Sequence, residues 1–450
     1  MNPDIQWALD AISARSADYD LARAYYDGQH RLDFVPSEFR HEFAALLRRA
    51  RLNMCPAVVT SVRDRLKLTG LTHNGEVKKE TEEGRERIVS DPVGERLNAL
   101  WRRNRMEQRA GEIHLESLTV GDAYAIVWPS ARTGEVTIYP NFAHMVAVQY
   151  DDEEPDMIVK AARKWAEPDK RVALNLYYPD RIEKYLTVNP LAQGGQLKAK
   201  MFAPVAGEEV VFNPYDQVPV FHFGNGAGCG RLGTSELKEA IPVQDALNKT
   251  LRDMLIGGEE QAFKQRYATG VELPTDPETG QKINPFVANE FWATAAKDAT
   301  FGELEAANLE QLQTVKDGYK MDMAMVTGLP PHHFFAGGGT PPSGESLKTL
   351  EQRLTSKVED RQTAFGATWE SLFKFALRLD SEVEDVELDA LWRDTTPRNE
   401  QEQQGMVLER VEKLGVPPEQ GLKELGYTGE EVAKFAEWKR TQGVQPGGAQ

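Results

Sequence analysis

The sequence predicts an α+β protein that is predominantly helical, and three patterns carry this prediction. Apolar residues recur every three or four positions over 345–379, which is the period of a single long helix. Between 124 and 223, apolar and polar residues alternate between turn signals, as they do in antiparallel strands. Two further helical patterns, at 236–263 and 309–326, flank a segment rich in proline and glycine. We therefore expect a region of mixed helices and strands followed by a succession of long helices.

Length, cysteine content and charge narrow the class of protein. At 450 residues the chain is several times the usual domain length, so we expect two or more structural regions. The two cysteines, Cys55 and Cys229, exclude a disulfide framework and a multi-cysteine zinc site. No apolar run approaches the roughly 20 residues of a membrane helix and no signal peptide is recognisable, so we expect no membrane partner. A net charge of −17 argues against a basic surface that binds nucleic acid tightly. It is compatible with a surface along which DNA moves without being bound tightly.

Residues 1–70 predict two helical segments, and the first ends at the turn signal Asp27-Gly28. The second, over 39–68, combines apolar positions with seven basic residues. We interpret these basic residues as a solvated helix face, and a stripe that faces a partner is the minor alternative. The polar and charged composition of 71–92 indicates an exposed excursion.

A helix predicted from residue 93 to 118 precedes the strands, and a pair of helices follows them. Thr234 or Ser235 can cap the first helix of the pair, and Pro242 is expected to kink it. A loop-like or strand-like insertion at 269–308 separates it from the second helix. If the two helices pack together they run antiparallel, and the insertion lies at their shared tip.

The segment from 329 to 343 holds four prolines and the three consecutive glycines Gly337 to Gly339, which exclude a regular helix and predict a loop. Ser343 can cap the long helix that comes next. At 1.5 Å per residue that helix would be roughly 50 Å long. Its apolar positions are Leu347, Leu350, Leu354, Val358, Phe365, Trp369, Leu372, Ala376 and Leu379.

Composition changes after the long helix. Between 380 and 394 the chain carries seven acidic residues and one basic residue. Short helices split by glycine and proline are predicted over 399–442, and the tail at 443–450 is predicted to be disordered.

The sequence specifies no reaction, and we predict no catalytic residues, no metal site and no cofactor. The glycines of the loop do not form a nucleotide-binding loop, because no lysine follows until Lys348. His332 and His333 are adjacent, but no nearby cysteine or acidic pair completes a metal-ligand set, so we assign them a loop-packing or surface role. His222 alternates within a strand and is expected to be a satisfied histidine of the core or its rim.

Several segments, in the same order along nearly the whole chain, resemble the portal proteins of tailed bacteriophages, in particular relatives of the portal of Bacillus phage SPP1 in phages of actinobacteria. The matching segments are AYYDGQHRL at 24–32, NMCPAVVTSVRDRLKLTGL at 53–71, LTVGDAYAIVW at 118–128, LKEAIPVQDALNKTLRDMLIGGEEQAFKQRYATG at 237–270, and TGLPPHHFF through GGGTPPSGESLK at 327–348. None is a sharp motif alone, and their co-occurrence carries the resemblance.

The resemblance implies a dodecameric ring at one vertex of the capsid, with a central channel for double-stranded DNA during packaging and ejection. It implies docking to terminase, to head-completion or adaptor proteins, and to major capsid and scaffold proteins. The implied location is the virion, with assembly in the host cytoplasm. The implied regions are a wing at 1–234, a first stem helix at 235–268, a clip at 269–308, a second stem helix at 309–328, a tunnel loop at 329–344, a long wing or channel helix at 345–379, and a helical crown at 380–450 that includes the disordered tail.

Two sets of functional residues follow from this resemblance. The loop lacks lysine and arginine between Thr327 and Lys348, so we expect it to meet DNA through polar and apolar groups and to bind it weakly. The predicted DNA-facing residues are Pro330, Pro331, His332, His333, Phe334, Phe335, Gly337, Gly338, Gly339 and Thr340. The predicted contacts between neighbouring stems are Leu237, Ile241, Leu247, Leu251, Met254, Val315, Met321 and Met325.

Two alternatives remain open at this point. A ring-forming head-completion adaptor would share the ring but would not need so long a stem. An enzyme associated with DNA packaging is disfavoured because the sequence shows neither a nucleotide-binding loop nor a cluster of metal-binding carboxylates. We therefore expect a structural protein without enzymatic activity.

Overall fold

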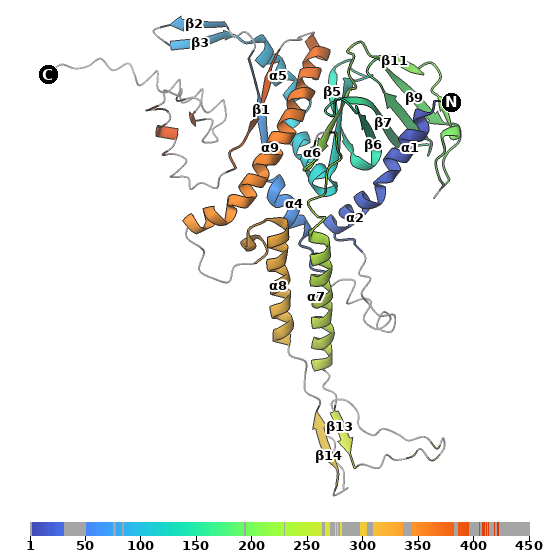
Figure 1. Cartoon of the computed structure of the whole chain (residues 1–450), viewed down its shortest axis with the longest axis vertical. Helices are drawn as coiled ribbons and strands as arrows, with labels where there is room; N and C mark the ends of the chain where they lie inside the picture. Colours follow the sequence, from blue (N-terminus) through green and yellow to red (C-terminus); the bar gives the residue numbers. More distant parts are fainter. Residues whose placement is uncertain are drawn as a thin grey trace, which may run out of the picture. The chain divides into compact units, whose positions relative to one another are not determined.

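The computed structural model of the chain describes residues 2–30, 51–74, 78–82, 85–192, 195–228, 230–262, 266–270, 298–303, 309–335, 344–381 and 386–395, with isolated residues in 275–280 and 405–422. Contacts divide the chain into two units, Met1–Asp394 and Thr395–Gln450. Helices and antiparallel strands both occur in the first unit (Figure 1), which confirms the predicted α+β class.

Two N-terminal helices, α1 (Asp4–Ala14) and α2 (Ser16–Tyr26), lie beside a six-stranded antiparallel sheet. Helix α1 buries Ile5, Ala8, Leu9 and Ile12, which share one face because their spacing follows the helical period. This face packs against strands of the sheet and forms a separate hydrophobic cluster with them. The strands are β6 (Val146–Tyr150), β7 (Ile158–Ala166), β8 (Val172–Tyr177), β9 (Arg181–Thr187), β10 (Phe202–Pro204) and β11 (Val210–Phe212).

The main core surrounds a three-stranded sheet of order β12-β4-β5. Its central strand β4 is buried at six successive positions, from Asp122 to Val127. Neighbouring strands flank it on both edges, and helices α6 (Met106–Val120) and α9 (Gly344–Ser381) also pack against it. Such a strand reads as a nearly continuous apolar run. Other elements that contribute to this core include α4 (Cys55–Arg63), α5 (Pro92–Arg103), β5 (Val136–Phe142) and β12 (Val220–Gly224).

Helices α7 (Ala240–Ala262) and α8 (Leu309–Thr327) pack side by side and antiparallel, as predicted (Figure 1). The first helix begins later than expected, so Pro242 falls in its first turn. Backbone N–H groups have no helical partner there, and proline therefore requires no kink. The insertion begins earlier than 269, because strand β13 (Arg266–Thr269) pairs with β14 (Thr300–Glu303). Most of the predicted insertion lies outside the described residues.

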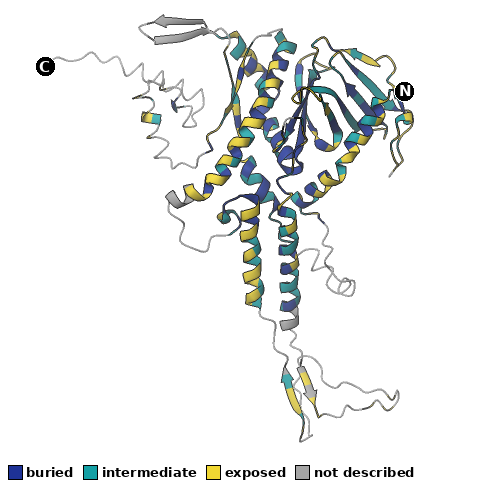
Figure 2. Ribbon diagram, in the orientation of Figure 1, coloured by how far each residue is buried: buried dark blue, intermediate teal, exposed yellow. Residues whose placement is uncertain are grey.

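Helix α9 is 38 residues long and agrees closely with the predicted long helix. Figure 2 shows buried and exposed residues alternating along it. Six of the predicted apolar positions are fully buried: Leu354, Val358, Phe365, Trp369, Leu372 and Ala376. Leu350 is 45% exposed, whereas its neighbour Glu351 is only 7% exposed, so the prediction is wrong in this turn. The buried stripe continues through Glu351, three positions before Leu354.

The first unit extends beyond α9 to Asp394, past residue 380, where the crown was predicted to start. Strand β15 (Leu388–Trp392) pairs antiparallel with β1 (Leu68–His73), more than 300 positions earlier in the chain, and Leu388 is buried. Residues up to Asp394 therefore belong to the first unit. The short hairpin of β2 (Lys78–Glu82) and β3 (Arg85–Ser90) occupies the segment predicted as an exposed excursion.

In the second unit the described residues, 405, 407–409, 411, 413, 418, 421 and 422, are all helical, in agreement with the sequence. The predicted disordered tail at 443–450 lies outside the described residues. Across the described part of the chain, we find no helix of the length and hydropathy that a bilayer crossing needs.

Candidate functional site

The candidate site is the junction at which α8 ends, the loop begins and α9 passes alongside. Helix α8 ends in a left-handed glycine, Gly328, with a φ of +71°. The N–H of Leu329 donates to the carbonyl of Ala324 at 3.1 Å, which is the six-to-one bond of a Schellman motif. Pro330 follows and prevents the helix from continuing.

The first residues of the predicted tunnel loop are anchored to the core. Residues Pro331–His333 form a 3-10 turn in which the N–H of Phe334 donates to the carbonyl of Pro331 at 3.0 Å. Phe334 is 4% exposed and belongs to the main core. Phe335 is half-buried, with the Lys320 ammonium 5.2 Å from its ring centroid.

This burial bears on the predicted DNA-facing set, because a side chain enclosed in the core has little surface to offer to DNA. Pro330 and Phe334 are buried and Phe335 packs against the core, because removing apolar side chains from water is favourable. Pro331 and His333 are half-buried, and His332 is exposed. Gly337, Gly338, Gly339 and Thr340 lie outside the described residues.

The two histidines converge with a carboxylate that the sequence analysis did not pair with them. His332 Nε2 lies 3.2 Å from Glu351 Oε1, and His333 Nε2 lies 3.8 Å from the same atom. The other carboxylate oxygen of Glu351 pairs with Arg65, and His333 Nδ1 lies 2.8 Å from Ser61 Oγ. Burial lowers the pKa of His333, and the charges of His332 and Arg65 act in the same direction. These contacts fasten the turn after α8 both to α9 and to the end of α4.

Cationic side chains of α9 bind the carbonyl end of α8. Arg353 Nη1 donates to the carbonyl of Met325 at 3.2 Å, and Lys357 Nζ donates to that of Thr327 at 3.0 Å. Both positive charges are favourable at a helix C-terminus, where the partial charge is negative.

The same face of α9 holds the segment that leads into α7, residues 230–239, which we call the approach to α7. Lys357 pairs with Glu236, and Arg361 Nη2 lies 3.0 Å from Glu236 Oε1. Arg361 Nε also donates to Asn225 Oδ1 at 2.7 Å. Burial alone would raise the pKa of Glu236, but the two cations outweigh it and hold the pKa below its usual value. Glu236 is therefore ionised, and it couples α9 to the approach to α7.

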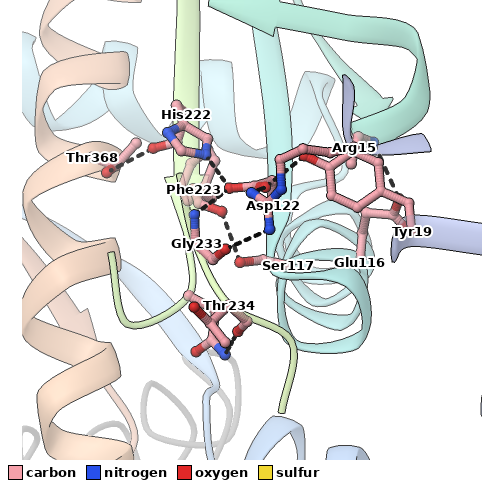
Figure 3. Close-up of polar contacts among 12 residues, drawn as sticks. Arg15, Tyr19, Glu116, Ser117, Asp122, His222, Phe223, Gly233, Thr234 and Thr368 are labelled. Carbon is pink, nitrogen blue, oxygen red and sulfur yellow. Dashed lines mark hydrogen bonds and ion pairs between the residues drawn. The ribbon is translucent and has the colours of Figure 1, made fainter. Parts of the chain in front are cut away.

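A second buried network, centred on Asp122, holds the same approach from the side of the sheet (Figure 3). Asp122 accepts hydrogen bonds from the Tyr19 hydroxyl at 2.6 Å, from His222 Nε2 at 2.8 Å and from the backbone N–H of Gly233 at 2.6 Å, and it also pairs with Arg15. Burial would raise the pKa of Asp122, but these donors lower it. His222, expected to be a satisfied histidine, is indeed fully engaged, because Tyr150 contacts its other nitrogen.

Glycine is required where the approach to α7 crosses the start of β4. A Cβ atom on Gly233 would lie 2.0 Å from the carbonyl oxygen of Gly121, closer than any side chain can be accommodated. The backbone N–H of Asn225 donates to that same oxygen at 2.8 Å. The strands and the approach to α7 are thus joined by direct backbone contact.

The predicted stem contacts fall into three groups by exposure. Leu237 and Leu247 have no exposed area, so they stabilise the subunit itself and offer no surface to a neighbour. Ile241, Leu251 and Met254 are half-buried. Val315, Met321 and Met325 are 46%, 43% and 65% exposed.

Sequence reasoning missed Glu351, Lys357, Arg361 and Glu236 as residues of the junction. For the three residues on α9 the available signal was position, because Glu351, Leu354 and Val358 follow one buried stripe, next to Lys357 and Arg361. Glu236, which precedes α7, left no such signal. Among the residues that the structure describes, His332, His333 and Glu351 form the one group of at least three histidine, cysteine or acidic residues with converging ligand atoms.

The chain is similar to two curated proteins, the portal protein of Mycobacterium phage D29, with 29% identity, and that of Mycobacterium phage L5, with 28% identity. Each alignment covers 232 residues, 49% of this chain and 48% of the relative. The chain thus spans about half the length of the curated relatives it matches.

Among solved structures, the chain is similar to chains from the neck of an empty GTA particle and of a native GTA particle, computed with C6 and C12 symmetry. The TM-scores are 0.45 and 0.46, with 14% and 12% identity, and each covers 86% of this chain and 94% of the other. A sequence profile described as "Phage portal protein, SPP1 Gp6-like" matches residues 6–444. This match extends over nearly the whole chain, and the protein therefore belongs to the family of SPP1 Gp6-like phage portal proteins.

Proposed function

We propose that this chain assembles into a ring, a dodecamer in the virion, that occupies one capsid vertex and conducts double-stranded DNA during packaging and ejection. The observation that carries the proposal is the family match over residues 6–444. The portal proteins of phages D29 and L5 support it as relatives over half of the chain. In this proposal the protein is a structural conduit and catalyses no reaction.

The exposed apolar residues of α8 support ring formation. At about 100° per residue, Met321 and Met325 lie on one side of α8, whereas Val315 and Val326 lie on another. All four side chains are at least 43% exposed. A ring is built from head-to-tail contacts, which require two different patches on each subunit. We assign these two sides of α8 to the contacts with the two neighbouring subunits.

The geometry of the junction narrows the proposed contact with DNA. Residues up to Phe335 are anchored, so the part of the predicted tunnel loop left to contact DNA is the segment 336–343, together with the exposed His332. A protein with a net charge of −17 repels phosphate, which suits a conduit that must not retain its cargo.

The partners that we propose are terminase during packaging, head-completion proteins afterwards, and the capsid and scaffold proteins around the ring. The insertion 269–308, with the β13–β14 ribbon, is the proposed docking point for terminase. Assembly would take place in the host cytoplasm.

Particle shape tests this proposal. Purified chain should give rings with a central hole in negative-stain electron microscopy and a multiple of the 50.4 kDa subunit mass in native mass spectrometry. Met325→Asp should shift the population toward smaller species, because it places a charge in an apolar contact, whereas Met325→Leu should retain the ring. A chain that stays monomeric at high concentration would contradict the proposal. Sustained ATP hydrolysis would favour a packaging enzyme instead.

A further inference from the structure

We propose that His332, His333 and Glu351 form a binding site for a divalent transition metal, with zinc as the best match, at the base of the loop between α8 and α9. The atoms available as ligands are the two histidine Nε2 atoms and Glu351 Oε1. One ligand atom from each of the three residues lies within 4.8 Å of the other two. His332 Nε2 is 3.2 Å and His333 Nε2 is 3.8 Å from Glu351 Oε1. The ring planes of the two histidines are inclined at 75°, with centroids 4.7 Å apart.

The hydrogen bonding around Ser61 fixes which nitrogen of His333 is free. The Ser61 hydroxyl donates its single hydrogen to the carbonyl of Ala57 at 2.6 Å. It must therefore accept from His333 Nδ1, 2.8 Å away, so that nitrogen carries the hydrogen. In the neutral ring the lone pair is then on Nε2, which faces the Glu351 carboxylate at 3.8 Å. Two acceptors that face each other in this way are stabilised by a cation between them.

The surroundings of these three residues match the supporting contacts of known metal sites. A histidine ligand commonly donates its second nitrogen to a protein acceptor, which orients the ring, and Ser61 has this role for His333. Arg65 pairs with Oε2 of Glu351 and leaves Oε1 directed at the histidines. The Glu351 side chain is 9% exposed and that of His332 is 39% exposed, so the site has a fixed floor and an open side.

Ligand type and spacing favour zinc over the alternatives. Calcium and magnesium prefer oxygen ligands, and copper(I) prefers sulfur. Zinc accepts two histidines and one carboxylate, with bonds of about 2.0 to 2.2 Å, which separates neighbouring ligands in a tetrahedron by about 3.3 Å. The observed 3.2 Å agrees with this separation, and the 3.8 Å pair needs an approach of about half an ångström. The fourth position would hold water.

A metal at this position would join the turn after α8 to α9 through three strong bonds. It would fix the position of the residues just before the segment 336–343. None of its three ligands belongs to that segment. The site is formed within one chain, so the inference does not depend on ring assembly.

Binding of Co²⁺ to untagged, chelator-treated full-length protein tests the site, because tetrahedral Co²⁺ absorbs visible light far more strongly than the hydrated ion. We expect saturation at one equivalent per chain and displacement of the signal by Zn²⁺. His332→Ala should weaken binding at least about tenfold, and because this side chain is exposed its loss should leave the fold intact. His144→Ala removes an exposed histidine outside the cluster and should bind as the wild type does.

Circular dichroism of each variant establishes that it is folded, and Glu351→Gln provides a second loss-of-binding variant. Absence of a saturable Co²⁺ signal would overturn the proposal and leave the cluster as a histidine–carboxylate ion pair. Equal affinity in the wild type and His332→Ala would overturn it as well, because the metal would then bind elsewhere.

Discussion

The ion pairs of Glu236 lead to a quantitative prediction for Glu236→Gln. The Glu236 side chain is 5% exposed, and Lys357 and Arg361 are 19% and 18% exposed. Removing one partner of a buried ion pair costs about 3 to 5 kcal/mol, because the remaining charge is left uncompensated. In this variant Lys357 still donates a hydrogen bond to the carbonyl of Thr327, and Arg361 still donates one to Asn225. Both cations also retain some access to water. We therefore expect a loss of about 2 to 3 kcal/mol of unfolding free energy.

The appropriate assay is urea unfolding at pH 7, at one protein concentration at which all variants are the same oligomeric species. Glu239→Gln is the matched control, because Glu239 is an exposed carboxylate three positions away. Its unfolding free energy should differ from that of the wild type by less than about 0.5 kcal/mol.

The pH dependence separates the ionic effect from a packing effect. The pKa of Glu236 is lowered on folding, so its stabilisation is present above the usual carboxyl pKa of 4.5 and is lost as the pH falls through the lower folded value. The difference between wild type and Glu236→Gln should therefore shrink below about pH 4.5. A loss no larger than that of Glu239→Gln, or one that persists unchanged in acid, would refute this account of the junction.

Two further predictions concern the end of α8 and the core. Gly328→Ala should lose about 1 to 2 kcal/mol in urea unfolding, because φ is +71° and the new Cβ would lie 2.9 Å from Arg353 Nε. Gly318→Ala, in α8 with open space around its Cβ, should instead stabilise by up to about 1 kcal/mol; equal effects would contradict the capping role. Burial lowers the pKa of His114 to about 4. Stability should therefore rise between pH 4 and 6.5 by up to about 3 kcal/mol from this group. Urea unfolding across this range should show a smaller rise for His114→Gln, and an unchanged slope would contradict the assignment.

Periodicity predicted the long helices because burial of their apolar stripes is a local property of the sequence. Leu354, Val358 and Trp369 recur at helical spacing and are buried as expected. The alternating residues around Tyr124 predicted strands for the same reason.

The pairing of distant segments could not be predicted in this way. Ser61 meets His333 across 272 positions, and β1 meets β15 across more than 300. Neither contact leaves a local pattern. Glu351 was missed because a carboxylate on a buried stripe is stable only when a partner such as Arg65 is supplied from elsewhere.

The resemblance placed Phe334 among the DNA-facing residues, whereas the structure buries this side chain in the core of the subunit. Proline and glycine exclude a regular helix, but they do not exclude burial of the side chains between them. The Schellman motif and the 3-10 turn direct Leu329 and Phe334 into the core. Local backbone geometry, rather than composition, decided where these residues lie.

The anchoring of the loop base to Glu351 has a mechanical consequence. The segment 336–343 starts two residues after a turn that is tied to Glu351, and it ends at Gly344, the first residue of the same helix. These two attachment points are seven residues apart on α9, about 10 Å along its axis. A force on the turn after α8 is therefore shared between α8, to which the turn is covalently joined, and α9, which holds it through the His332–Glu351 contact.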